Sequence, residues 1–237
     1  MLKAGKIFNG NILLNYFSEE NISERMTLNE SEIHVWILDI QNYNESSLKR
    51  LTNILSMDEK IKMSRYMHVK DQKCFLIGHG MLRIVLSQYL QKYPESIIFS
   101  ENKYGKIHMP QSNVSFNISH SGNKVVLAFA KEMQIGVDIE RMGVIEDYAQ
   151  IAKKFFLPQE SKLICSQTDA AKGMEYFYKI WTVKEAYVKA IGCGLSRSLK
   201  TFEVLEAGSV VDYSNNQKYN YYSRRLKDNY ICSLIVT

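Results

Sequence analysis

The chain has 237 residues, of which 46% are hydrophobic and 23% charged, and this balance excludes a disordered or fibrous protein. The net charge of +5 suits a polyanionic ligand or an acidic partner protein. A mildly basic surface explains the charge as well, and the excess is too small to indicate nucleic acid.

The cysteines and the apolar segments point to a soluble cytoplasmic protein. The four cysteines are scattered, with no C-x-x-C pair, so reduced thiols are expected rather than disulfides or a zinc site. No apolar run approaches the length of a membrane span. The N-terminus lacks the apolar core and small-residue cleavage site of a signal peptide.

The first part of the chain predicts one strand followed by two helices. Residues 1–30 are polar and irregular, and we expect an N-terminal extension or edge segment there. Alternating apolar residues predict a strand over 33–40. Ser56 and Glu59 have the spacing of a capping box and predict a short helix towards Tyr66. A longer helix is predicted over 71–93, before Pro94.

The second part predicts a mixture of strands and helices. Strand composition covers 113–118, 124–130, 134–139, 198–205 and 230–236. Helices are predicted over 148–156, from Pro158 onwards and over 176–191, where Gly192 ends the last one.

Two similar α/β halves are the architecture that this order favours. SRYM before the helix at Asp71 resembles KKFF before Glu160, although the similarity is weak. We expect an N-terminal extension over 1–30, an N-terminal half over 31–125 and a C-terminal half over 126–237.

Two acidic residues stand two positions apart in a predicted strand. Side chains alternate between the faces of a strand, so Asp138 and Glu140 in QIGVDIE project to the same face, about 7 Å apart at their Cα atoms. A hard divalent cation neutralises such a pair, and magnesium completes its octahedron with water and substrate phosphates. Two solvated acids at an exposed strand edge are the alternative, and the D-x-E pattern alone favours it.

Three charged residues lie on or beside the apolar arc of the helix predicted over 176–191. Lys184 projects from near the middle of the arc, where an unpaired ammonium is costly. An ordinary i,i+4 ion pair explains Glu185 and Lys189 but leaves Lys184 unexplained. A site accounts for all three, with the carboxylate binding metal or removing a proton and the lysines binding phosphates.

The segment SFNISHSG is interpreted as a strand that ends at Ile118, followed by a turn over 119–122. The hydroxyls, backbone N–H groups and imidazole of this turn are useful phosphate donors, and a simple hairpin turn is equally expected. The serines have no G-x-S-x-G around them, and the chain has neither a Walker A motif nor G-x-G-x-x-G.

Taken together, these stretches resemble the surfactin-synthetase-activating type of 4′-phosphopantetheinyl transferase. The matching segments are SFNISHSG, IGVDIE, KKFF followed by Glu160, and FYKIWTVKEAYVKAIGCGLS. The pattern from Trp181 to Ser196 is highly specific when it follows GVDIE. A weaker likeness through KYGKI and SRYMHVKD extends upstream to the strand at Ile33.

The resemblance implies an α+β fold of two similar α/β halves related by pseudo-twofold symmetry, with the active-site cleft between them, in a monomer. It implies a magnesium-dependent reaction in which coenzyme A is the co-substrate. The phosphopantetheine arm is transferred to a serine of an apo acyl or peptidyl carrier protein, and adenosine 3′,5′-bisphosphate is released. No nucleic acid or membrane partner is expected.

The resemblance also implies roles for individual residues. Asp138, Glu140 and Glu185 would hold the magnesium ion. Glu185 or Glu160 would remove the proton from the carrier serine, with Lys189 completing the catalytic set. Contacts to the phosphates and the nucleotide are expected from a larger set of polar side chains, namely Lys62, Lys73, Lys106, Ser119, His120, Lys184 and Lys189.

The sequence departs from the family pattern at two places. Where the family commonly has D-R-x-R-F, this chain has DQKCF at 71–75, so Lys73 replaces only part of the charge. The family's G-K-P appears as Gly105, Lys106 and Ile107.

Two other functions are compatible with parts of the pattern. A non-catalytic module that binds carrier proteins or coenzyme A would be favoured by loss of a metal ligand, but all three ligand positions are present. A metal-dependent phosphoesterase would need a further Asp/His cluster, and the sequence offers none. The transferase is therefore preferred.

Overall fold

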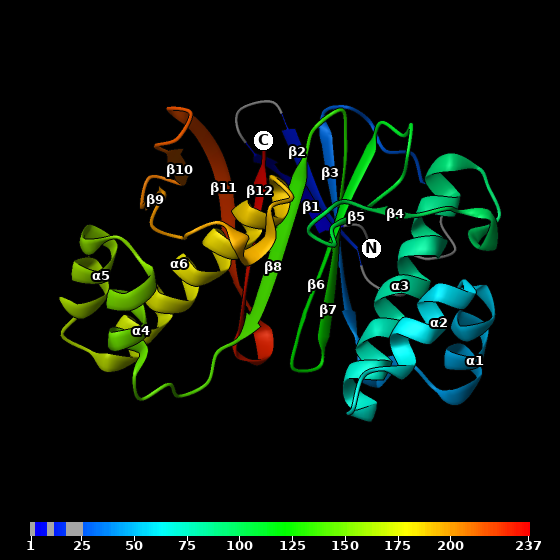
Figure 1. Cartoon of the computed structure of the whole chain (residues 1–237), viewed down its shortest axis with the longest axis horizontal. Coiled ribbons are helices and arrows are strands. Elements are labelled where there is room, and N and C mark those ends of the chain that lie inside the picture. Colours follow the sequence, from blue (N-terminus) through cyan, green and yellow to red (C-terminus); the bar gives the residue numbers. More distant parts are fainter. Residues whose placement is uncertain (1–2, 9–11, 18–25) are drawn as a thin grey trace. The chain divides into compact units, whose positions relative to one another are not determined.

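The computed structural model of the chain describes residues 3–8, 12–17 and 26–237. The described residues form two compact units. Unit 1 contains the described residues up to Ser100 together with Ile107–Glu132, and unit 2 contains Glu101–Lys106 and Met133–Thr237. Each unit combines a five-stranded sheet with helices (Figure 1), which is an α+β arrangement.

The sheet of unit 1 has the order β1-β2-β3-β7-β6. Its strands are β1 (Lys3–Phe8), β2 (Ile12–Phe17), β3 (Glu32–Asp39), β6 (Val114–Ser121) and β7 (Lys124–Lys131). β2 pairs in parallel with β3, and the other neighbours pair antiparallel. β1 and β2 lie within the expected N-terminal extension over 1–30. Of the remaining residues of this extension, only 26–30 are described. The expected boundary at 125/126 would divide β7, which pairs along its length with β3 and β6.

The described part of unit 1 contains the α-helices α1 (Glu45–Ile54), α2 (Met57–Ser64) and α3 (Val69–Leu90). Asn44 caps α1, which the sequence did not predict, by accepting from the N–H of Ser47. The predicted capping box of Ser56 and Glu59 is confirmed at the start of α2. Helix α3 ends at Gln91, which has a left-handed backbone.

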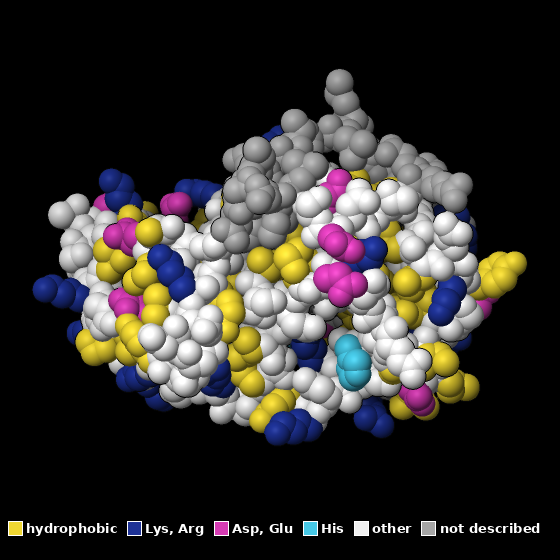
Figure 2. All heavy atoms as spheres, turned by 90° about the horizontal axis from the view of Figure 1, so that it is seen from above, with side chains coloured by type: hydrophobic (Ala, Val, Ile, Leu, Met, Phe, Trp, Pro, Cys, Tyr) yellow, Lys and Arg dark blue, Asp and Glu magenta, His cyan; other side chains and the backbone are white. Residues whose placement is uncertain are grey.

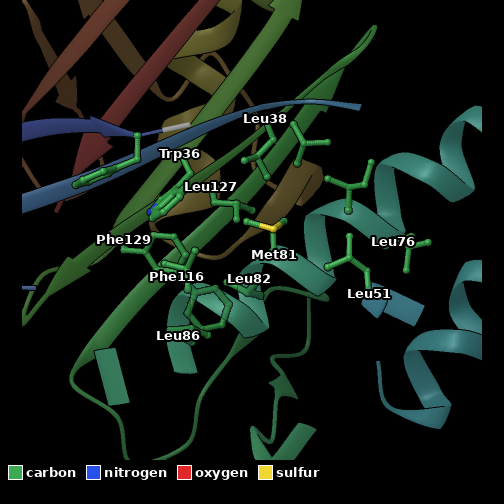
Figure 3. Close-up of a cluster of buried hydrophobic side chains, with 14 of the residues drawn as sticks. Trp36, Leu38, Leu51, Leu76, Met81, Leu82, Leu86, Phe116, Leu127 and Phe129 are labelled. Atoms are coloured by element: carbon green, nitrogen blue, oxygen red, sulfur yellow. The ribbon is translucent and has the colours of Figure 1, made fainter. Parts of the chain in front are cut away.

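The core of unit 1 lies between α3 and the sheet (Figure 3). Trp36 and Leu38 of β3 and Leu127 and Phe129 of β7 are fully buried. Side chains from the helices and from β6 complete the cluster, among them Leu51, Leu76, Met81, Leu82, Leu86 and Phe116. Burial of this apolar surface holds the helices against the sheet.

The hairpin of β6 and β7 is longer than the sequence suggested. The expectation that the strand ends at Ile118 is wrong, because pairing continues through His120 with Val125 and Ser121 with Lys124. A two-residue turn of Gly122 and Asn123 closes the hairpin, with Gly122 at a φ of 58° that favours glycine. Ser119 and His120 are therefore strand residues, with Ser119 buried and His120 exposed.

Unit 2 contains an antiparallel sheet in the order β8-β12-β11-β10-β9. Its strands are β8 (Ile135–Arg141), β9 (Phe202–Leu205), β10 (Ser209–Asp212), β11 (Gln217–Leu226) and β12 (Tyr230–Val236), and its helices are α4 (Tyr148–Phe155), α5 (Pro158–Cys165) and α6 (Ala170–Ala190). The prediction of a strand from residue 198 is wrong for its first part, since a turn from Ser198 to Thr201 precedes β9.

The remaining regular elements are short. β4 (Ser100–Glu101) and β5 (Ile107–His108) form a two-stranded sheet. The 3₁₀ helices are η2 (Ile40–Asn42), η3 (Pro94–Ser96), η4 (Gly194–Ser196) and η5 (Lys227–Asn229).

Helix α6 packs across β8 and β12 at close range (Figure 1). A Cβ atom at Gly136 of β8 would lie 1.9 Å from the carbonyl oxygen of Ala186 and 2.5 Å from the backbone nitrogen of Ala190. The two backbones meet at this point, and any side chain at Gly136 would force them apart. On the same face, Thr182 of α6 lies 2.7 Å from Ser233 of β12, oxygen to oxygen.

A buried ion pair joins α2 to α3. Glu59 of the capping box lies 2.8 Å from Arg83, and His79 Nδ1 lies 3.0 Å from Glu59 Oε1. Burial alone would raise the pKa of Glu59, but the hydrogen bonds from His79, the Ser56 N–H and Arg83, with the Arg83 charge, lower this pKa to about 2.

Glu59 should make the stability of the protein sensitive to acid. Its pKa is lower in the folded chain than the value of about 4.3 in an unfolded chain, so its contribution is complete above that value and is lost as the pH falls towards 2. We expect the unfolding free energy to fall by about 3 kcal/mol across this window through Glu59 alone. Glu59→Gln should have a lower unfolding free energy at neutral pH, and its unfolding free energy should fall less as the pH is lowered. Urea unfolding between pH 2 and 7 measures both differences. Parallel curves for the two proteins would contradict the assignment.

None of the described helices is both long and apolar enough to cross a membrane. On the face that Figure 2 displays, lysine and arginine side chains are scattered among acidic and hydrophobic ones.

Candidate active site

The strand β8 and the helix α6 bring two oppositely charged side chains together. Asp138 lies at the centre of β8, and Lys189 lies in the last turn of α6. Lys189 Nζ is 2.6 Å from Asp138 Oδ1 and 3.4 Å from the carbonyl oxygen of Val137. The close approach at Gly136 makes this contact possible, because it sets the last turns of α6 directly over β8.

Glu185 lies one turn before Lys189 in α6, and the charges of Asp138 and Glu140 act on it. Burial, the charge of Asp138 and the charge of Glu140 raise the pKa of Glu185, Lys189 opposes the rise, and the resulting pKa is about 7. The oxygen Oε1 of Glu185 is buried and accepts no hydrogen bond from the described residues. The three predicted acids therefore act on one another electrostatically in unit 2.

These acids suit a hard divalent cation. The described residues contain no group of three His, Cys, Asp or Glu side chains that could hold a metal ion. Magnesium does not require one, since it is bound through few carboxylates and keeps waters and substrate phosphates as its other ligands. Burial is the main cause of the raised pKa of Glu185, and the charges of Asp138 and Glu140 add to it. A cation at the unpartnered oxygen Oε1 of Glu185 would neutralise these acids.

A second pair of predicted site residues lies inside unit 2. Lys184 is 0% exposed and its Nζ lies 3.0 Å from Glu160 Oε1. The same ammonium donates to the carbonyl oxygens of Leu199 at 2.7 Å and Phe202 at 2.8 Å, which uses its three donors. Burial lowers the pKa of Lys184, and the charge of Glu160 opposes this effect.

Glu160 is likewise occupied within the unit. It forms the capping interaction at the start of α5 by accepting from the N–H of Leu157 at 2.9 Å. Its other oxygen accepts from the N–H of Val204 at 2.7 Å. Burial raises the pKa of Glu160, while the charge of Lys184 and these hydrogen bonds act in the opposite direction.

The two units contain the same arrangement of charges. Glu59 and Arg83, like Glu160 and Lys184, are 24 positions apart, with the acid at the start of a short helix and the cation in the following long helix. Each cation also binds two backbone carbonyls beyond its helix and lies over a phenylalanine ring. The contacts of Arg83 are Pro94, Ile97 and Phe99, and those of Lys184 are Leu199, Phe202 and the Phe202 ring.

The repeat differs in register from the one suggested by the sequence. SRYM begins at Ser64, the last residue of α2, whereas KKFF covers the last three residues of α4 and Phe156 after it. The buried ion pairs instead match α2 with α5 and α3 with α6, so the match between those two motifs is wrong.

The other predicted phosphate ligands are divided between the units. Lys62 is exposed near the end of α2, Lys73 is half-buried in α3, and Ser119 and His120 lie in β6, all in unit 1. Lys106 belongs to unit 2, where its Nζ donates to the carbonyl oxygens of Ala190 and Ile135.

Sequence reasoning did not identify a further network at the end of α6. Asp212 of β10 is fully buried and accepts hydrogen bonds from Tyr187 of α6 and from Arg197. Ser214 donates to the same carboxylate. These residues are far apart in the chain and form no motif, so only the sheet pairing of β10 could have indicated the contact.

Comparison with known proteins identifies one family across both units. Residues 134–235 match the 4′-phosphopantetheinyl transferase superfamily, and residues 42–132 match the N-terminal region of 4′-phosphopantetheinyl transferases.

Individual relatives cover both units as well. The 4′-phosphopantetheinyl transferase HetI of Nostoc is 35% identical over 73% of this chain and 73% of its own length. The 4′-phosphopantetheinyl transferase Sfp of Bacillus subtilis is 37% identical over 66% of this chain and 68% of its own. The transferase gsp of Aneurinibacillus migulanus is 34% identical over 77% and 76%, respectively.

Proposed function

The chain belongs to the 4′-phosphopantetheinyl transferase superfamily, and we propose how its own residues carry out the magnesium-dependent transfer. The enzyme moves the phosphopantetheine arm of coenzyme A onto a serine of a carrier protein. The serine oxygen forms a bond to the phosphorus that carries pantetheine, and the pyrophosphate bridge breaks. Adenosine 3′,5′-bisphosphate leaves with the bonding electron pair.

The observation that carries the proposal is the cluster of Asp138, Glu140, Glu185 and Lys189. Asp138, Glu140 and Glu185 would hold magnesium, which when bound supplies charge neutralisation at the pyrophosphate. The charges of Asp138 and Glu140 add to burial in raising the pKa of Glu185, which supports this role. Lys189, 2.6 Å from Asp138, adds a positive charge beside the position proposed for the pyrophosphate.

Glu185 is the residue that we propose to take the proton from the carrier serine. A base must lie within hydrogen-bond reach of the proton that it takes, and the oxygen Oε1 of Glu185 accepts no hydrogen bond from the described residues. The other candidate, Glu160, already accepts from Leu157, Val204 and Lys184. We therefore assign Glu160 and Lys184 to holding α5, α6 and β9 together.

Further phosphate and nucleotide contacts remain predictions from the family resemblance. We assign them to Lys62, Lys73, Ser119 and His120, which offer ammonium groups, a hydroxyl and an imidazole. The repeated ion pairs of the two units support the inference of two related halves. A monomer is the form that we expect, because the resemblance implies it, and the scattered cysteines favour the cytoplasm.

One incubation tests the function. The purified protein is mixed with an apo carrier protein, coenzyme A and Mg²⁺, and the carrier is weighed by mass spectrometry, with EDTA in a parallel sample. We expect a gain of one phosphopantetheine group that EDTA prevents. Measurable coenzyme A binding without any gain on acyl and peptidyl carrier proteins would indicate a non-catalytic binding module, and a gain in the presence of EDTA would overturn the metal assignment.

A further inference from the structure

The short loop Glu101–Lys106 belongs to unit 2, although the chain on both sides of it belongs to unit 1. Asn102 organises this loop, since its side-chain oxygen accepts from the N–H groups of Tyr104 at 2.9 Å and Lys106 at 3.0 Å. The backbone N–H of Asn102 donates to the carbonyl oxygen of Lys106. Gly105 takes a φ of 83°, which glycine adopts without strain. The loop therefore has a defined shape.

The loop supplies hydrogen bonds to the carboxyl end of α6. The last carbonyl groups of a helix lack partners within the helix, and a turn beyond α6 satisfies those of Tyr187, Val188 and Lys189. The next ones are satisfied from the loop. Lys106 Nζ donates to the carbonyl oxygen of Ala190 at 2.9 Å, and Asn102 Nδ2 donates to that of Gly192 at 2.7 Å.

Glycine at position 192 makes room for these contacts. A Cβ atom there would lie 3.0 Å from Asn102 Nδ2 and 3.3 Å from Lys106 Cδ. Gly192 also has a φ of 71°, in the left-handed region. Gly192 thus allows the left-handed backbone that ends α6 and leaves space for Asn102 and Lys106 of the loop.

Lys106 connects α6 to β8 as well. Its Nζ lies 3.3 Å from the carbonyl oxygen of Ile135, the first residue of β8. Ile135 and Ala190 flank the point at which Gly136 meets the backbone of α6. Burial of the ammonium group lowers the pKa of Lys106 to about 8.

We propose that Lys106 is a positioning residue that fixes the end of α6 against the start of β8, and so sets Lys189 and Glu185 over Asp138. The expected effect on catalysis rests on the proposed function, whereas the contact of Lys106 with α6 and β8 does not depend on it. It differs from the nucleotide contact that the family resemblance implies for Lys106. Its basis is that the ammonium group donates to backbone carbonyl groups on both of the elements that carry the acids.

Three variants test this role. Lys106→Met keeps the apolar stem and removes the donors, whereas Lys106→Arg keeps donors of similar reach. Lys103→Met is the matched control, because Lys103 lies in the same loop, is exposed and stacks over Tyr104. Each variant is first shown to be folded by circular dichroism. Two readouts follow, namely hydrogen exchange of the peptide that spans 186–194 and steady-state transfer kinetics.

We expect Lys106→Met to speed exchange in the 186–194 peptide and to lower kcat by about tenfold or more, since small displacements of reacting groups are costly. The KM for coenzyme A should change less than about threefold, because no ligand contact is removed. Lys106→Arg should restore most of the exchange protection and of kcat. Lys103→Met should match the unsubstituted protein in both readouts.

The alternatives are separable. A rise in KM for coenzyme A with unchanged kcat and unchanged exchange would show a direct nucleotide contact and overturn the proposal, as would unchanged values throughout. If Lys106→Met does not fold, Lys106→Arg is the deciding variant. Hydrogen exchange and kcat close to those of the unsubstituted protein would then support the positioning role. Loss of exchange protection or of kcat in Lys106→Arg would refute the positioning role. Faster exchange in a chain that transfers nothing to any carrier would uphold the positioning contact while refuting the transferase function.

Discussion

Asp138→Asn and Glu185→Gln are each expected to reduce phosphopantetheine transfer by about 10³-fold while leaving the chain folded. Each change keeps the size of the side chain and removes one negative charge from the cluster on β8 and α6. The proposed work of this cluster is to neutralise the pyrophosphate through magnesium, so the loss should appear in kcat measured at saturating coenzyme A. A carrier-protein mass assay with time points provides the rate.

Glu175→Gln is the matched control for these two substitutions. Glu175 also lies on α6, but it pairs with Arg225 at the surface, where the two side chains are 43% and 57% exposed. Its neutralisation should leave the rate within about twofold, because exposed ion pairs contribute little. Rates close to those of the unsubstituted protein for Asp138→Asn or Glu185→Gln would exclude that residue from the site.

Lys184→Met is expected to lower the free energy of unfolding by about 3–5 kcal/mol, the cost of leaving one charge of a buried pair without its partner. Lys184 is 0% exposed and Glu160 is 2% exposed, so solvent cannot compensate the remaining carboxylate. The two carbonyl oxygens that Lys184 binds would also lose their donor. Urea unfolding at neutral pH measures the difference.

Arg225→Met provides the comparison at the surface. It breaks the exposed pair with Glu175 and should cost at most about 1 kcal/mol. The double variant Glu160→Gln with Lys184→Met should recover part of the loss, because it removes the uncompensated charge. Equal losses for Lys184→Met and Arg225→Met would refute a structural role for the buried pair.

Kinetics of Lys184→Met distinguish the structural role from a phosphate contact. At a temperature where the variant is folded, the proposed role predicts an unchanged KM for coenzyme A. A KM that rises severalfold would restore the contact with phosphate that the sequence implies for Lys184.

The local parts of the fold could be predicted from the sequence because their signals lie within a few residues. Alternation within β8 placed Asp138 and Glu140 on one face, and the contact of Asp138 with Lys189 puts Asp138 on the face that α6 covers. The spacing of Ser56 and Glu59 predicted the capping box that the structure shows. Gly192 marked the end of α6, where its φ is positive.

Other parts depend on contacts that the sequence does not display. Helix α1 is mostly polar and buries only Leu51, so its apolar pattern was too weak to predict it. Residues 170–175 join α6 even though Gly173 lies among them, because Tyr148 and Ile164 pack close to that glycine.

The partners of charged residues were the hardest feature to predict. The sequence indicated that Lys184 would be costly to bury alone, but it could not show that Glu160 and two carbonyl groups surround it. Lys106 presented the same difficulty, since its partners lie 29 and 84 positions away. The sequence pattern around a lysine does not distinguish a lysine that completes a buried network from one that binds a ligand.

The loop Glu101–Lys106 also has a consequence for the order of events during synthesis on the ribosome. The loop belongs to unit 2, whereas the last residue of unit 1 is Glu132, so unit 1 can form its core while the rest of the chain is still being translated. The loop must wait, because its partners Ala190 and Gly192 are made 84 and 90 residues after Lys106 and Asn102. Seating of the loop is therefore a late step in maturation, and the acids of β8 and α6 reach their final arrangement only then.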